Sequence, residues 1–249
     1  MIAGPSARRQ FLTGATAALL LPALPRPARA RPEDVPYAIL QAFGKIAPQD
    51  GRITLDLPQH SDQGTSVPLT VTSDSPMTEA DYPRTLALYG SSNPRPGNCT
   101  LHFTPLGGVP WFSTRIRLNG AQDVVAVLEG RAGDHWRTSA RVSVTFGACA
   151  TAASGDALPP DWQPTIKISV PEMARLGEVI TVRTVITHPM ETGLRLDEFY
   201  ADVPLRIIQR FTCSQAGATV FDMKLDARHR HQSLSVVSDD RADVRGSGL

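Results

Sequence analysis

The chain has 249 residues, which is enough for one large domain or two domains of ordinary size. Apolar residues make up 41% and charged residues 20%, a composition that supports a packed core and excludes a wholly disordered or fibrous protein. Lys and Arg together number 25 and Asp and Glu 24, so the charge gives no reason to expect nucleic-acid binding. The three cysteines are odd in number and too few for a disulfide scaffold.

The first 30 residues have the form of an export signal. Arg8 and Arg9 precede a weakly apolar run that extends to Leu24, and Ala28-Arg29-Ala30 fits a cleavage site. This run is only about 14 residues long, whereas a membrane-spanning helix needs about 20. We therefore predict a twin-arginine signal peptide over residues 1–30, export to a bacterial periplasm, and no membrane span. The alternative is a chance pair of arginines before a core helix.

The next segment, residues 31–150, begins with a predicted short helix over Val35–Phe43, because Tyr37, Leu40 and Phe43 recur at three-residue spacing. Beyond it the apolar residues alternate with polar ones, as in β-strands. About seven short strands separated by turn clusters predict a β-sandwich of immunoglobulin type. The expected strands are Ile53–Leu57, Val67–Thr72, Thr85–Tyr89, Cys99–Phe103, Trp111–Leu118, Val124–Leu128 and Arg137–Phe146.

Residues 151–164 are small, polar or proline, which predicts a linker between two domains. A second, smaller β domain follows over residues 165–249. Its expected strands are Ile166–Val170, Val179–Ile186, Leu205–Phe211 and Val220–Leu225. Residues 228–249 are atypical and offer only Leu234, Val236 and Val237 for a strand, so we expect this domain to be incomplete. The predicted fold is thus all-β, with two immunoglobulin-like β-sandwich domains joined by a linker.

The three cysteines lie in different surroundings. Cys99 and Cys213 alternate with large apolar residues, which predicts that both are buried in the core. Cys149 follows the last strand of the first domain and has no large side chain beside it. It is either an incidental thiol or a thiol displayed on a mobile arm. No charged residue lies within five positions of it, which favours a thiol loaded by other enzymes over a self-activating nucleophile. The small residues expected to make the arm flexible are Gly147, Ala148 and Ala150.

No other motif in the sequence indicates catalysis. A phosphate loop, a dinucleotide fingerprint, a nucleophile elbow and a zinc motif are all lacking. His188 has no second His or Cys at ligand spacing, and His229 and His231 lie in a polar tail. We therefore predict no catalytic residue, no cofactor and no metal site.

Two sets of short strings resemble the two subunits of the sulfur-oxidation carrier complex, SoxY and SoxZ. The SoxY-like strings are Gly51–Pro58, Val67–Val71, Asp74–Thr78, Asn93-Pro94, Phe103–Pro105 and Ser113–Leu118. The SoxZ-like strings are Ile166–Pro171, Gly177–Ile180, Thr187–Gly193, Phe211–Cys213 and Val220-Phe221. They occur in order over most of residues 50–225, so the chain resembles a SoxYZ fusion, with a SoxY-like domain over 31–150 and a SoxZ-like domain over 165–249.

The resemblance implies a non-catalytic carrier whose two domains pair with each other. In that family, a cysteine on a swinging arm carries sulfur intermediates, and Cys149 occupies this position. The implied partners are a conjugating cytochrome, a sulfate-releasing hydrolase and a sulfur dehydrogenase. Fused members are associated with quinoprotein dehydrogenases, which leaves an alternative function as a non-covalent adaptor for such an enzyme, with Cys149 dispensable. Here the chain continues past Cys149, so the arm is a loop and not a free tail.

Overall fold

The structure is a computed structural model that describes residues 34–147, 163–175, 177–188, 200–201, 203–204, 206–225, 233–239 and 243–247. Its first half contains α1 (Asp34–Phe43), β1 (Ile53–Asp56), β2 (His60–Gln63), β3 (Val67–Ser73), β4 (Pro83–Gly90), β5 (Gly97–Phe103), the short 3₁₀ helix η1 (Pro105–Gly107), β6 (Trp111–Ile116), β7 (Gln122–Gly130) and β8 (His135–Phe146). Its second half contains β9 (Thr165–Ser169), β10 (Val179–Thr187), β11 (Arg210–Gln215), β12 (Ala218–Leu225), β13 (Ser233–Asp239) and β14 (Asp243–Ser247). The expected signal peptide and nearly all of the expected linker lie outside the described residues.

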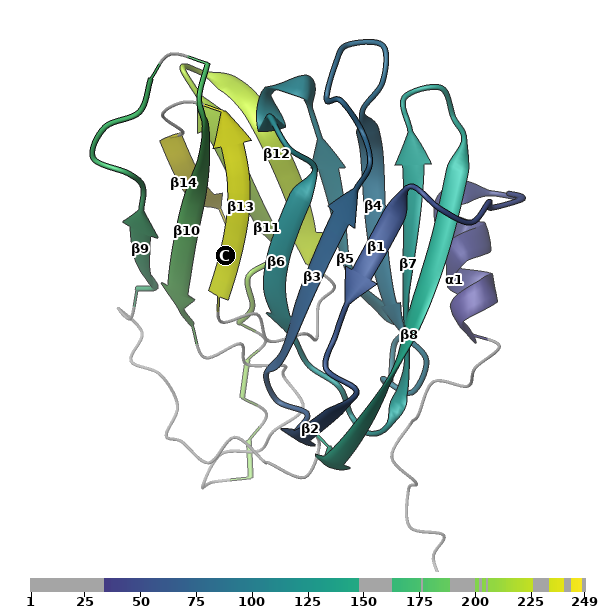
Figure 1. The fold of residues 1–249 in the computed structure, drawn as a ribbon. Coiled ribbons are helices and arrows are strands. Elements are labelled where there is room, and N and C mark those ends of the chain that lie inside the picture. The colour runs from purple at the N-terminus through teal and green to yellow at the C-terminus, as the bar shows by residue number, and fades with distance from the viewer. Residues whose placement is uncertain are drawn as a thin grey trace, which may run out of the picture.

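The strands form two layers, and both layers take strands from the two halves of the chain (Figure 1). The six-stranded sheet has the order β1-β3-β6-β13-β10-β9, and the eight-stranded sheet has the order β14-β11-β12-β5-β4-β7-β8-β2. At the junctions, β12 pairs with β5 and β13 pairs with β6, both antiparallel. The all-β prediction is confirmed, but the halves share two continuous sheets where we expected a separate sandwich from each. These two pairings give hydrogen-bond partners to the backbone groups that β5 and β6 would otherwise expose at a sheet edge.

One hydrophobic core fills the space between the sheets and includes side chains from both halves. Leu101 and Phe112 come from the first half, and Phe211, Phe221 and Met223 come from the second; all five are almost completely buried. The rings of Phe211 and Phe221 are 5.6 Å apart between centroids. Because the halves contribute to the same core, we expect them to unfold together.

Helix α1 lies on the outer face of the eight-stranded sheet (Figure 1). Its Val35 is buried in a second, smaller apolar cluster with Tyr89 of β4 and with Val125 and Val127 of β7. The opposite face of β7 contributes Val124, Ala126 and Leu128 to the main core. Burial on both faces explains why β7 is a continuous apolar run and not an alternating one.

Three parts of the chain differ from the sequence-based expectation. The strand β2 was not predicted because its sequence, His-Ser-Asp-Gln, has no apolar residue. The strand expected over Leu205–Phe211 is wrong in position: β11 begins at Arg210, where pairing with β12 starts, and the adjacent Ile207 and Ile208 are both buried without strand alternation. Residues 228–249 supply two strands, β13 and β14, where we expected an incomplete domain; β13 adds seven pairs to β10. Within the described part of the chain, no helix is both long and apolar enough to cross a membrane.

Candidate functional site: the root of the cysteine arm

Of the four residues predicted to form the carrier arm, only Gly147 lies among the described residues. Ala148, Cys149 and Ala150 lie outside them, so their roles stay predictions. The structure does describe the segment from which this arm departs, residues 143–147, which we call the arm root. It consists of the last four residues of β8 and Gly147.

The arm root extends beyond the strand that pairs with most of β8. The β7–β8 register ends at the pair Gln122–Val142. From Ser143 onward, β8 instead pairs in parallel with β2, through His60–Ser143, Ser61–Val144 and Gln63–Phe146 (Figure 1). The polar strand β2 therefore pairs with the end of β8. This role could not be predicted from the sequence of β2, which has no apolar residue.

The carbonyl group of Phe146, the last residue of β8, is bound by a short relay of backbone hydrogen bonds. The Gly64 N–H donates to the Phe146 carbonyl at 2.8 Å, and the Leu118 N–H donates to the Gly64 carbonyl at 2.7 Å. Gly147 then lies directly against the turn after β6: a Cβ atom on it would be 2.1 Å from the Asn119 carbonyl oxygen. The end of β8 is thus bound on one side by Gly64, and Gly147 lies against the backbone of Asn119 on the other.

The outer surface of the arm root combines polar and apolar groups. Phe146 is 62% exposed although it is the last residue of a strand. Beside it, His60 Nε2 lies 3.1 Å from Asp62 Oδ1 and 3.4 Å from Thr145 Oγ1. Phe146 precedes Cys149 by three residues. An exposed aromatic ring at this position is a group that a partner protein can contact.

Cys99 and Cys213 are buried as predicted, with exposed fractions of 4% and 1%. Burial raises the pKa of Cys99 to about 12 and that of Cys213 to about 11. The thiolate is the reactive form of cysteine, so neither residue is suited to carry a covalent intermediate at neutral pH.

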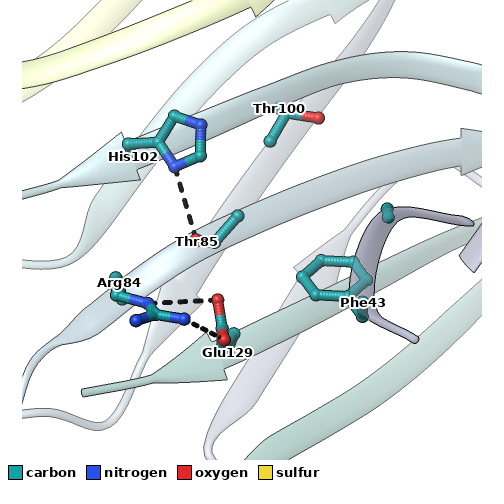
Figure 2. Close-up of a pocket in the computed structure, with 7 residues that line it drawn as sticks. Phe43, Arg84, Thr85, Thr100, His102 and Glu129 are labelled. Carbon is teal, nitrogen blue, oxygen red and sulfur yellow. Dashed lines mark hydrogen bonds and ion pairs between the residues drawn. The ribbon is translucent and has the colours of Figure 1, made fainter. Parts of the chain in front are cut away.

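A pocket of about 490 Å³ lies on the outer face of the eight-stranded sheet, next to the end of α1 (Figure 2). Its charged walls are already paired, because the Arg84 guanidinium donates two hydrogen bonds to the Glu129 carboxylate. Opposite this pair, His102 Nδ1 lies 3.3 Å from Thr85 Oγ1. Within the described ranges, no group of three or more His, Cys, Asp or Glu is arranged to hold a metal ion. The pocket therefore presents no free charge to a ligand.

His102 in this pocket makes the stability of the fold depend on pH. Its pKa is lowered, mainly because burial disfavours the charged ring and also because Lys224 repels it, although Asp222 and Glu129 oppose the shift. Between the lowered pKa and the unfolded value of about 6.5, the unfolded chain binds more protons than the folded one. We expect the free energy of unfolding to fall as the pH drops below about 6.5. Urea unfolding at a series of pH values should show that His102→Gln reduces this loss; an unchanged slope would contradict the assignment.

Two family models match the chain in sequence order: "Sulfur oxidation protein SoxY" over residues 39–149 and "Sulphur oxidation protein SoxZ" over residues 166–228. No curated protein matches the chain. Among solved structures, the sulfur carrier protein SoxY from Chlorobium limicola f thiosulfatophilum is 23% identical over 46% of this chain and 98% of its own, with a TM-score of 0.40. The superoxide reductase (neelaredoxin) from Ignicoccus hospitalis is 17% identical over 43% of this chain and 86% of its own, with a TM-score of 0.35. The first family match ends on Cys149.

Proposed function

Because the chain belongs to the SoxY and SoxZ families of sulfur-oxidation proteins, as a SoxY segment fused to a SoxZ segment, we propose that it carries sulfur-compound intermediates covalently on Cys149. The observation that carries this proposal is that the SoxY match ends on this cysteine, two residues beyond the arm root. The twin-arginine motif at Arg8-Arg9 supports a place of work in the periplasm. The chain is then a carrier on which separate enzymes act.

The proposed loading step joins the Cys149 sulfur to the outer sulfur of thiosulfate. The S–H bond breaks, an S–S bond forms, one proton leaves to water, and two electrons pass to the conjugating cytochrome. A sulfate-releasing hydrolase then uses water to remove the sulfonate group as sulfate, which leaves a persulfide on Cys149. A sulfur dehydrogenase then oxidises that remaining sulfur, with water supplying the oxygen atoms and the dehydrogenase accepting the electrons. This chain supplies the thiol and its placement, and the enzymes supply the catalytic groups.

The geometry of the arm root is suited to this role. Three residues beyond Phe146 give the thiol a reach on the order of 10 Å, from a root that β2 and the Gly64 relay hold in place. The two buried cysteines do not compete for loading, because their thiols are shielded and their pKa values are raised. The exposed ring of Phe146 provides an apolar contact for the rim of a partner's active site.

The proposal is tested on the full-length carrier recovered from the periplasmic fraction and incubated with thiosulfate and the conjugating cytochrome. Intact-mass measurement is expected to show a gain equal to one S₂O₃ unit, and peptide mapping is expected to place it on Cys149. Recovery only from the cytoplasm would contradict the localisation. A carrier that gains no mass would contradict covalent loading and leave the non-covalent adaptor for a quinoprotein dehydrogenase as the alternative.

A further inference from the structure

A second cavity, of about 320 Å³, lies beside α1, between the helix, the loop that follows it and the outer face of β7 and β8. We call it the α1 cavity. Pockets that bind small molecules are commonly of this size, and they combine an apolar lining with a few polar groups. The α1 cavity has this composition: its cationic side chains are Lys45 and Arg137, and its apolar lining includes Ile39, Leu40, Ile46 and Val127.

The backbone around the α1 cavity is held in place by hydrogen bonds. The Gly44 N–H donates to the Leu40 carbonyl at 2.9 Å and ends the helix, and the positive φ of Gly44, 73°, lets the chain turn back. Further along the loop, the Gln49 N–H donates to the His135 carbonyl at 2.8 Å, and the Gln49 carbonyl accepts from the Arg137 N–H at 3.0 Å. Both ends of the loop are therefore attached, one to α1 and one to β8.

The floor of the cavity places a cationic side chain next to an apolar one. Val127 of β7 and Arg137 of β8 are paired in the antiparallel register, so both side chains lie on the same face of the sheet. The Cβ atoms of such a pair are about 5 Å apart. Val127 is completely buried and belongs to the smaller apolar cluster next to α1. A ligand in the cavity thus meets an apolar surface with a guanidinium group at its border.

The two cations of the α1 cavity lack the partners that other arginines of this sheet have. Three arginines each bind a carboxylate, in the pairs Arg84–Glu129, Arg141–Asp123 and Arg210–Asp222. Within the described part of the chain, no residue forms an ion pair with Lys45 or Arg137. A planar guanidinium group can bind a carboxylate through two parallel hydrogen bonds. Charge complementarity therefore favours a carboxylate as the ligand's head group.

We propose that the α1 cavity binds a small monocarboxylate with an apolar chain. The carboxylate pairs with Lys45 and Arg137, and the chain lies against Val127 and the apolar residues of α1. A neutral ligand would leave both cations without a partner, and an anion without an apolar chain would leave the apolar lining in water. This inference does not rest on the proposed function, which concerns Cys149 and not this cavity.

The test titrates the full-length protein with butanoate, hexanoate and octanoate and follows the backbone amides by nuclear magnetic resonance. We expect hexanoate to bind with a Kd on the order of 1 mM and to shift the amide signals of the cavity lining. Each CH₂ group that enters the cavity should tighten binding about fourfold, until the cavity is full. Hexanol should bind about tenfold more weakly than hexanoate, because it makes no charged hydrogen bond. Hexylammonium should not bind.

Two pairs of matched variants locate the site. Arg137→Gln and Lys45→Gln are each expected to weaken hexanoate binding by about threefold to tenfold. Arg141→Gln removes the same charge from the same face of β8, outside the cavity lining, and should change the Kd by less than about twofold. Leu40→Ala should weaken binding by about threefold or more, whereas Tyr37→Ala, at an exposed position of α1 outside the lining, should not.

The inference is overturned if hexanoate shifts no amide of the lining, if hexanol binds as tightly as hexanoate, or if Arg141→Gln weakens binding as much as Arg137→Gln. Sedimentation with phosphatidylglycerol vesicles, lost equally in Leu40→Ala and Tyr37→Ala and without binding of free hexanoate, would assign this surface to a membrane instead. If the parent is not loaded by the cytochrome but binds hexanoate as expected, the proposed function is wrong and the cavity assignment stands. Loading without hexanoate binding would give the reverse result.

Discussion

Replacing Cys149 with serine is expected to abolish loading of the chain. The adduct requires a new S–S bond to the sulfur atom of residue 149, and a hydroxyl oxygen cannot form it. The two other cysteines do not substitute for it, because burial raises the pKa of Cys99 to about 12 and that of Cys213 to about 11. Their thiolate fractions at neutral pH are correspondingly small, and the core shields both sulfur atoms.

The matched control is the double variant Cys99→Ala/Cys213→Ala, which should gain the same S₂O₃ mass as the parent. Each alanine removes only one buried sulfur atom, so the fold is expected to survive. Intact-mass measurement after incubation with thiosulfate and the conjugating cytochrome distinguishes the variants. An adduct that persists in Cys149→Ser, or that disappears in the double variant, would show that the carrier thiol has been misassigned.

Truncating Phe221 to alanine is expected to lower the free energy of unfolding of the whole chain by about 3–5 kcal/mol. Phe221 lies in β12, at the junction with β5, where its register partner is Phe103. It is almost fully buried and its ring packs against Phe211. Because the core is shared between the halves, the loss affects both of them. The melting temperature should fall by on the order of 10 °C, in a single transition.

Phe146→Ala is the matched control for this prediction, since it removes the same side chain from a position that is 62% exposed. We expect it to change the free energy of unfolding by no more than about 0.5 kcal/mol. Differential scanning calorimetry provides the comparison. Two separate transitions in the parent, or a variant at Phe221 that destabilises only one of two transitions, would be inconsistent with a common core.

Local patterns in the sequence were sufficient to predict most of the strands of the first half. In β3, for example, Val67, Leu69 and Val71 alternate with more exposed residues, and all three are buried as the alternation requires. The helix α1 was predicted from its apolar spacing and differs from the prediction by one residue. The polar strand β2 could not be predicted in this way, since it is held by backbone pairing with β8 and by no burial of its own.

The candidate site, too, could be predicted from the sequence only in part. Cys149 stood out because its neighbours are small and uncharged, a feature that is visible in a few consecutive residues. The buried hydrogen bonds that Asn93 and Gln122 make with each other and with the turn at Asn119 and Gly120 did not stand out. Gln122 nevertheless lies on the same face of β7 as the core residues Val124 and Ala126. A glutamine at an inward-facing position is a signal of a buried polar contact, but the pattern does not say which backbone groups it binds.

The sequence by itself therefore determined the all-β class and the SoxY-then-SoxZ order, because both depend on side-chain type and on spacing along a short stretch. It also predicts Cys149 as the carrier cysteine, and that role stays a prediction. Only the tertiary structure decided how the halves combine and how the arm is anchored. The pairing of β5 with β12 and the contact of Gly147 with Asn119 join segments that are distant in sequence. Such contacts depend on which sheet edges meet and on how closely two backbones approach, and neither quantity is encoded in local alternation.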